Sequence, residues 1–506
     1  MIKILIIFIF ISQCFVQELT DDMPYYELVK KEMTGINNGK VSEGTFLYPH
    51  LKKSTKNTHI NLSKLKSIHI EPVMAIRWSS AGFEMVPIQT PSSVLWITPG
   101  LKISASTYLF DPHLNIWIYA WGRFNKHSAY GFNGNNVQSN LQLFPYSPNH
   151  SVEYYNRTEE PKNGIDFDES LGGIALLNPK FDIIWGKFRS HIGPSIRSNI
   201  HLSRNTPAYS QFRIHLKPVK KLHMTFMLGQ LNSGIPDSLR YDQLYEDNIE
   251  IIDKIPTVPR YISMHRIDYL ISDKIRVGFW EQVIYGGRSI PFEYMNPLTL
   301  YWSAQHKLGD VDNVQMGFDL EILFGKNRLY GAFLMDEWSL FKTLDEENNH
   351  NWFGIQLGGS RVMEIAGKQV LFTGEYARLD PRIYIHRFEI NNPAHHLYNL
   401  GYWSGGHSQD IWLSATSFIN EKLNFTIYSQ LTKKGQQDVD RIYGEEPINW
   451  MTGIINERNI FGFEGNYISK NNLRYNIKIQ YLDTQNLYND DSVFDVTMAI
   501  FYNLYQ

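Results

Sequence analysis

Apolar and polar residues alternate along many stretches of this chain. In 473–482, which reads LRYNIKIQYL, every second residue is apolar or aromatic, and the residues between them are mostly polar. The same period of two runs through 314–323, 422–431 and 493–505. Successive side chains of a β-strand leave opposite faces of the pleat, so this pattern predicts half-buried strands. About ten residues is also the length that a tilted strand needs to cross a membrane.

The connections between these segments alternate in length. Short turns join them in pairs at residues 111–114, 178–181, 218–221, 271–274, 325–328, 366–369, 419–422 and 469–472. Long, polar or irregular connections separate the pairs at residues 122–170, 190–211, 230–261, 284–313, 337–351, 379–407 and 432–457. An outer-membrane barrel has this arrangement, with short periplasmic turns at one end and longer loops at the outer end.

The hairpins, one strand within 71–98 and the final strand together predict an all-β fold. We expect a transmembrane antiparallel β-barrel of about 18 strands. In such a barrel, Tyr475 and Ile477 face lipid, whereas Arg474 and Lys478 face a polar interior. A soluble secreted protein with several sheets is the remaining alternative, because one alternating strand has the same sequence in both settings.

The N-terminus has the layout of an export signal. Lys3 precedes an apolar run over 4–11, and smaller or polar residues follow. Cys14 is the only cysteine and lies in this region, so the exported chain has neither disulfides nor cysteine ligands. The cleavage position and lipidation of Cys14 stay open.

The segment that follows the signal differs from the rest of the chain. It contains two predicted short helices, at 24–33 and 61–67, and could plug the barrel. We therefore divide the chain into a signal peptide (1–17), a partly helical periplasmic or plug segment (18–68) and the barrel (69–506).

Composition and motifs exclude several classes of function. The 506 residues carry a net charge of −3, which gives no field to attract nucleic acid. No G-x-S-x-G, H-E-x-x-H or P-loop motif appears. We expect no enzyme, no cofactor and no nucleic-acid partner.

Large aromatic residues lie at many predicted strand ends, as in the girdles at the two water interfaces of a membrane barrel. The alternative is that these rings fill the interior. The residues concerned are Trp78, Trp96, Trp117, Trp121, Trp280, Trp338, Trp352, Trp412, Tyr481 and Tyr502.

Three stretches resemble the capsule-assembly Wzi family of outer-membrane proteins. Residues 191–216 are similar to its Gly-Pro segment and Leu-Ser-x-Asn run. Residues 264–301 resemble its His-Arg hairpin, Glu-x-x-Ile-Tyr strand end and Asn-Pro-Leu, and 328–338 resemble its Leu-Tyr-Gly strand with an acidic end. The resemblance runs over most of the chain beyond the signal.

This resemblance implies a lectin in the outer membrane of a Gram-negative-type bacterium. An eighteen-stranded barrel with a helical N-terminal plug would bind capsular or exopolysaccharide and attach or assemble it at the cell surface. Outer-membrane lipid would surround the barrel, and polysaccharide export machinery would be a further partner.

Polysaccharide binding needs aromatic rings for the C–H faces of sugars, and planar guanidinium, amide or carboxylate groups for their hydroxyls. Two long connections supply such groups. The predicted glycan-binding residues are Arg288, Phe292, Glu293, Tyr294, Asn296 and Trp302 in the first, and Asp336, Glu337 and Trp338 in the second. The alternative is that Arg288 and Glu293 pair with each other or with lumen residues and only brace the connection.

A cluster of histidines raises the question of a metal site. His395, His396, His407 and Asp410 lie in or next to one long connection, and imidazole with carboxylate can bind a transition metal. Metal ligands are usually spaced more tightly on regular elements. We therefore predict solvated loop histidines and no metal.

A porin for small solutes is the main alternative function. In that case the lumen-facing residues Arg474, Lys478, Asp319, Glu321 and Glu375 line the channel. The same charges could instead pair across the lumen and hold the N-terminal segment inside it.

Overall fold

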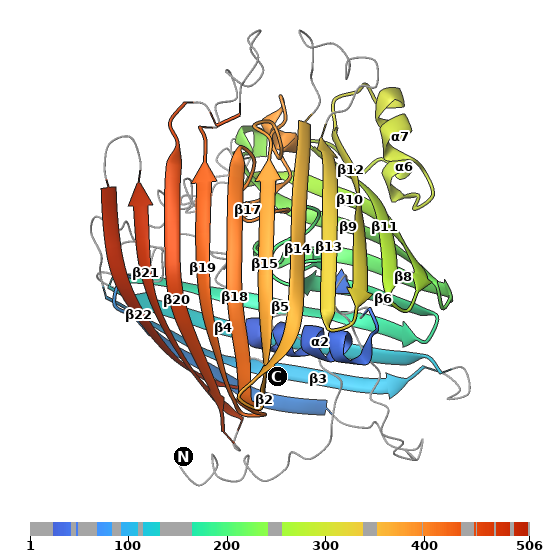
Figure 1. Cartoon of the computed structure of the whole chain (residues 1–506). Helices are drawn as coiled ribbons and strands as arrows, with labels where there is room; N and C mark the ends of the chain where they lie inside the picture. Colours follow the sequence, from blue (N-terminus) through green and yellow to red (C-terminus); the bar gives the residue numbers. More distant parts are fainter. Residues whose placement is uncertain are drawn as a thin grey trace.

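The computed structural model describes residues 24–41, 47–48, 68–82, 93–109, 115–131, 164–240, 256–336, 352–396, 398–436, 450–451, 453–469, 472–485 and 490–503. Within these residues, 18 antiparallel strands form one closed barrel (Figure 1). The ring closes where β2 (Ile68–Ser79) pairs with β22 (Asp490–Tyr502). The predicted fold class and strand number are confirmed.

The strands follow one another around the ring in chain order. Between β2 and β22 lie β3 (Val94–Tyr108), β4 (Trp117–Tyr130), β5 (Gly164–Asn178), β6 (Phe181–Phe188), β8 (Tyr209–Val219), β9 (Leu222–Pro236), β10 (Thr257–Ser272), β11 (Ile275–Gly286), β12 (Asn313–Phe324), β13 (Asn327–Asp336), β14 (Trp352–Ile365), β15 (Lys368–Leu379), β18 (Ser408–Asn420), β19 (Leu423–Lys434), β20 (Asn456–Ile468) and β21 (Leu473–Gln485). Each hairpin predicted from a short turn is a pair of neighbouring strands.

Several shorter elements are not part of this ring of strands. Two small sheets pair β1 (Leu47–Tyr48) with β7 (His191–Ile192), and β16 (Ala394–His395) with β17 (Tyr398–Asn399). The described helices are α2 (Tyr25–Asn38), α6 (Phe292–Met295), α7 (Tyr301–Lys307) and the 3-10 turn η2 (Glu389–Asn391). None of the helices among the described residues is long and apolar enough to cross a membrane.

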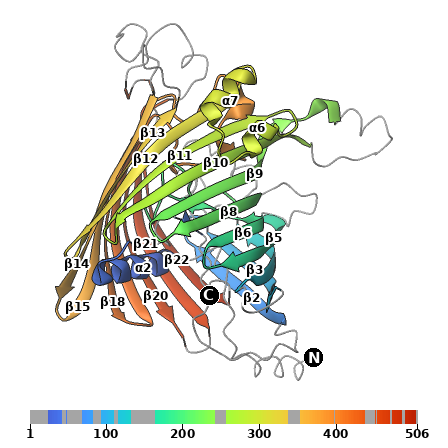
Figure 2. The same cartoon turned by 90° about the vertical axis from the view of Figure 1, so that its right-hand side faces the viewer.

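Helix α2 lies inside the barrel, near the short turns (Figures 1 and 2). It is longer than the helix predicted over 24–33 and ends at Asn38; the following residue is Gly39, whose φ of 62° suits a residue without a side chain. The second predicted helix, at 61–67, lies outside the described residues.

The outer wall of the barrel is apolar. On β12, Phe318 and Leu320 are exposed, whereas Asp319 and Glu321, which alternate with them, are buried inside. On β21, Tyr475 is exposed on the outer face. A closed barrel with exposed apolar residues outside and buried polar residues inside has the arrangement of a membrane barrel.

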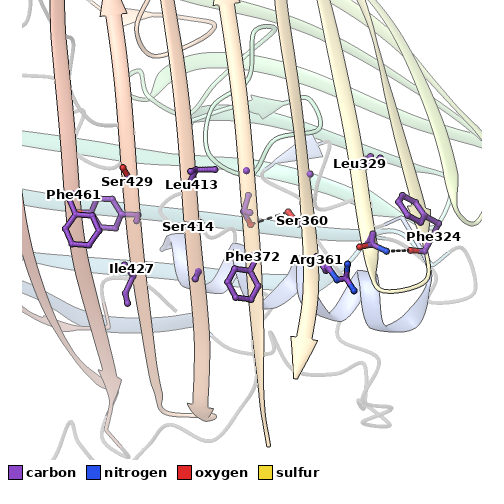
Figure 3. A pocket seen from close by; sticks show the side chains of 16 residues that line it. Phe324, Leu329, Ser360, Arg361, Phe372, Leu413, Ser414, Ile427, Ser429 and Phe461 are labelled. Atoms are coloured by element: carbon purple, nitrogen blue, oxygen red, sulfur yellow. Dashed lines mark hydrogen bonds between the residues drawn. The ribbon is translucent and has the colours of Figure 1, made fainter. Parts of the chain in front are cut away.

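A groove on this outer wall crosses β12 to β20. Gly359 and Gly374 face each other there across β14 and β15, and neither carries a side chain to fill the space. The surrounding side chains that face outward include Leu329, Phe372, Leu413, Ile427 and Phe461 (Figure 3). Since its lining is apolar and part of the lipid-facing wall, lipid chains fill such a groove in a membrane.

The prediction that the tryptophans form a girdle at the water interfaces is mostly wrong. Trp96, Trp121, Trp280 and Trp352 are buried, and Trp412 lies against the guanidinium of the interior residue Arg197. Trp78 and Tyr481 do face outward, and Trp338 lies outside the described residues. Trp280 and Trp352 pack against segments of the chain that fold into the lumen, whereas Trp121 packs against Tyr119 and Phe188 of the wall.

Candidate functional site

Three segments fill much of the lumen on the side lined by β8 to β19. They are α2, the connection between β6 and β8 (residues 189–208, lumen loop A) and the connection between β15 and β18 (residues 380–407, lumen loop B). From the alternation of short and long connections, both were predicted to be outer loops. Instead, residues 190–208 are all buried, and so are most residues of lumen loop B.

Helix α2 is fixed to the wall by both apolar contacts and charge. Its Leu28, Val29, Met33 and Ile36 pack against a cluster that includes Leu323, Val362 and Leu371 of the barrel and Ile196 of lumen loop A. Glu32 accepts a hydrogen bond from Arg328 at 2.9 Å. Arg328 also donates to the backbone carbonyl of Pro194. One buried guanidinium therefore joins the helix, the wall and lumen loop A.

A ladder of buried charges on β10 to β13 supports this arrangement. Arg266 and Arg276 both bind Asp268 and Asp319, at distances of 2.5 to 2.9 Å. Arg328 continues the ladder by binding Glu321 at 2.7 Å. Buried charges are tolerated when they are paired in this way. The acidic residues expected to line a porin channel here are instead paired with arginines.

Lumen loop A is held through Arg197. The guanidinium of Arg197 donates to Asp410 of β18 at 2.7 Å and to the hydroxyl of Tyr402 in lumen loop B at 3.1 Å. It also lies 4.5 Å from the ring centre of Trp412. Burial would lower the pKa of Arg197, but Asp410 and the other acidic neighbours raise it above its ordinary value. Arg197 is therefore a permanent positive charge that joins both lumen loops to the wall.

Asp410 is the common acceptor of this region. It also accepts from the Tyr402 hydroxyl at 2.7 Å, the Trp403 indole at 3.2 Å and the Thr432 hydroxyl at 2.7 Å. A carboxylate with this many donors is bound on all sides by the protein. It acts as a structural anchor with no oxygen left for a metal.

Lumen loop B also binds the wall at two further points. Arg260 of β10 donates to the carbonyls of Glu389, Ile390 and Ala394 at 2.6 to 2.9 Å. Asp336 accepts from the backbone N–H of Tyr384 at 3.0 Å and from Gln315 at 2.6 Å. Asp336, one of the predicted glycan-binding residues, is thus a buried support for lumen loop B.

Six other predicted site residues lie in the connection between β11 and β12. Arg288 pairs with Asp312, which also accepts from the Tyr294 hydroxyl at 2.6 Å. Burial raises the pKa of Tyr294, and Asp312 raises it further. Glu293 pairs with Lys307 at 3.1 Å. Arg288 and Glu293 therefore brace this connection, although not with each other.

The remaining predicted residues differ in their exposure. Tyr294 is fully buried, whereas Phe292 and Trp302 are exposed. The side-chain oxygen of Asn296 accepts from the backbone N–H of Leu298 at 3.1 Å. Glu337 and Trp338 lie outside the described residues.

An Arg-Phe pair that was not among the predicted site residues lies at the end of the barrel that carries the long connections. Arg387 donates to the carbonyl of Asp310 at 2.6 Å, and its guanidinium lies 5.0 Å from the ring centre of Phe388. Both side chains are exposed. The signal for this pair in the sequence is an arginine directly followed by an aromatic residue within a long connection.

Those histidines are not solvated, contrary to the sequence prediction. His395 and His407 are buried. His395 accepts from the backbone N–H of Asn232, whereas Nδ1 of His407 lies 2.8 Å from the carbonyl of Gln436. In the described part of the chain, no group of three or more His, Cys, Asp or Glu could hold a metal ion. The two rings serve to fix lumen loop B.

Comparisons with known proteins show the fold. No family model and no curated protein matches the chain. The structure of Wzi from Escherichia coli, described as a carbohydrate-binding β-barrel involved in group 1 capsule assembly, matches 85% of this chain and 83% of its own, with a TM-score of 0.51 and 12% identity.

Structures of proteins named Occ also match. OccAB1 of Acinetobacter baumannii has a TM-score of 0.48 at 8% identity, over 87% of this chain and 96% of its own. OpdK of Pseudomonas aeruginosa, solved with vanillate, has a TM-score of 0.47 at 8% identity, over 87% of this chain and 98% of its own.

Proposed function

We propose that this protein is an outer-membrane lectin of a Gram-negative-type bacterium, which binds capsular or exopolysaccharide and attaches or assembles it at the cell surface. The proposal includes export through a signal peptide at 1–17 and contact between the short turns and polysaccharide export machinery. It assigns the chain no catalytic step.

The packing of the lumen carries this proposal. Both lumen loops are pinned by buried charges, and they occupy space that a wide solute channel would need. A loop fixed in this way can present a rigid surface at the outer end of the barrel, and rigid surfaces bind ligands at a lower entropic cost. The similarity in fold to the carbohydrate-binding Wzi barrel is in keeping with this reading.

The proposed glycan site lies at the outer end of lumen loop B. It consists of Arg387 and Phe388, with Arg288 from the predicted set close by. Arg387 binds the carbonyl of Asp310, and Arg288 binds the carboxylate of Asp312, two residues further along. An exposed ring beside guanidinium groups suits a sugar that carries a carboxylate.

A binding assay tests the proposed site. The wild-type protein in detergent should bind surface polysaccharide purified from the source cells, measured by biolayer interferometry. Replacing both Arg387 and Phe388 with Ala should weaken binding by about tenfold or more, since each lost contact is worth ~1 kcal/mol. Lys433→Ala, which removes another exposed cation from a strand end, is the matched control. Equal binding by all three proteins would reject the site.

A porin remains the second candidate because one side of the lumen is less tightly packed. The inward residues Arg77, Arg123, Arg474 and Lys478 are only partly buried. Positive residues along a water-filled path would favour anionic solutes. Conductance in planar bilayers separates the two functions: steady open channels without polysaccharide binding would favour the porin.

A further inference from the structure

The outward-facing side chains of β11 change from exposed to buried halfway along the strand. Phe279 faces outward and is 61% exposed, as expected of a lipid-facing residue. The next outward positions are Glu281, Val283 and Tyr285, and all three are buried. Since these side chains point away from the lumen, another part of the chain must cover them from outside.

The covering segment is the connection between β11 and β12, residues 287–312, which we call the outer flap. Its Tyr294, Tyr301 and Ala304 form one buried cluster with Val283 and Tyr285. Figure 1 shows α6 and α7 of this flap beside the ends of β10 to β12. The flap therefore folds over the outer wall of the barrel.

Glu281 fixes the flap in place. This carboxylate accepts hydrogen bonds from the backbone N–H groups of Tyr301 and Trp302, at 2.9 and 2.6 Å. Nε2 of His265, on the neighbouring strand, lies 3.0 Å from it. A carboxylate on the apolar face of a membrane strand would be costly without such partners.

The free surface of the flap is strongly apolar. Phe292, Leu298 and Leu300 are 85%, 76% and 64% exposed, and Met295 and Trp302 are about half exposed. The charged end of the flap carries His306, Lys307 and Asp310. Exposed apolar residues at this density are unusual on a surface that faces water.

This surface is continuous with the lipid-facing wall. Phe279 on β11 has Ile267 of β10 and Phe318 of β12 as its paired neighbours, and all three are exposed. The flap covers β11 from Glu281 onward, which is the next outward-facing residue after Phe279. Its apolar side chains thus extend the lipid-facing surface toward the outer end of the barrel.

We propose that the outer flap is a membrane-interface anchor, with Phe292, Leu298 and Leu300 inserted among the acyl chains of the outer leaflet. Trp302 would lie at the level of the head groups, where amphipathic rings are favoured. A glycan surface suits this site less well, because exposed leucines offer nothing to sugar hydroxyls. The proposal does not depend on the proposed lectin function.

Spin labels test the depth of the flap directly. Single cysteines replace Leu298 or Leu300 in a full-length Cys14→Ser background, since Cys14 is the only native cysteine. Leu413→Cys, in the lipid-facing wall, gives the reference for lipid, and Lys307→Cys gives the reference for water. After reconstitution in phospholipid vesicles, collision with oxygen and with a water-soluble nickel complex is measured.

The expected result is that labels at 298 and 300 resemble the label at 413. Their ratio of oxygen to nickel accessibility should be several-fold higher than at 307. Ratios equal to that at 307 would overturn the proposal. If the labels at 298 and 300 became shielded from the nickel complex only after polysaccharide was added, the flap would be a glycan surface instead. Heat-modifiable gel migration of each variant shows that the barrel has folded.

Discussion

The connections after β11 and after β15 make an informative pair. Both are long, both are rich in aromatic residues, and both leave the end of the barrel that carries the long connections. Lumen loop B folds into the barrel, where Tyr402 and Trp403 are fully buried. The outer flap folds over the outside and leaves Phe292 exposed.

The difference depends on where the strands offer buried acceptors. For lumen loop B, the buried acceptors are Asp336 and Asp410 on the inner face of the wall. Both accept hydrogen bonds from N–H or O–H groups of the loop. The outer flap finds Glu281 on the outer face. Apolar contacts support either direction, whereas an unpaired buried carboxylate is costly. These carboxylates, together with Arg260, which binds three carbonyls of lumen loop B, therefore favour opposite paths for the two connections.

The largest effect should come from Asp410→Ala. This change leaves the buried guanidinium of Arg197 without its closest acceptor, which costs about 3–5 kcal/mol. We expect lumen loops A and B to loosen together, which would lower the melting temperature and open channels in planar bilayers. Gln409→Ala, one residue away on the same strand, is the control. Wild-type stability and a silent bilayer would show that Asp410 does not hold the lumen loops.

Glu281→Ala tests the other side of the comparison. Loss of the carboxylate removes the acceptor for two backbone N–H groups of α7, and we expect a cost of about 1–3 kcal/mol. Amide hydrogen exchange should rise in 287–312 while lumen loop B stays protected and the bilayer stays silent. If exchange rose equally in both connections, the two would not be independent.

The sequence predicted the barrel but not the paths of its connections. Strand period and connection lengths are local properties, so they gave the strand number and the hairpins. The direction of a loop depends on contacts such as that between Arg197 and Asp410, more than two hundred residues apart, and no local pattern contains them.

Two signals in the sequence were nevertheless available. Trp280 lies four residues after Arg276 on β11, so both side chains leave the same face of the strand. Because a charged residue such as Arg276 is expected in the lumen, the alternation already predicted that the Trp280 ring lies inside the barrel. Glu281 falls in phase with Phe279 and Val283, and a carboxylate on that apolar face indicated that something must cover it. Of the predicted site residues, Asp336 was the hardest to place, because its role depends on Tyr384 in another connection.

Acid should loosen the lumen loops more than the outer flap. Burial lowers the pKa of His191 in lumen loop A to about 3, with a further contribution from Arg204. Burial likewise lowers the pKa of His386 in lumen loop B to about 4. Both rings are neutral when folded, whereas the unfolded state takes up protons below the ordinary pKa of 6.5.

The stability that these histidines contribute is therefore present above pH 6.5 and is lost as the pH falls toward 4 and then 3. Limited proteolysis at pH 7.5, 5.5 and 4.5 should show increasing cleavage in lumen loop B. Replacing His386 with Asn removes one titrating ring and should reduce this pH dependence. Cleavage that is independent of pH in the wild type would contradict the assignment.

The smallest effect should come from Arg288→Lys in the outer flap. The change keeps the positive charge beside Asp312 but loses the planar guanidinium, and Asp312 keeps its hydrogen bond from Tyr294. Arg288 is about one-third exposed, so solvent screens the pair and we expect at most ~1 kcal/mol of local destabilisation. Hydrogen exchange in 287–312 should rise less than in Glu281→Ala. An equal or larger rise would show that the ion pair between Arg288 and Asp312, and not Glu281, holds the flap in place.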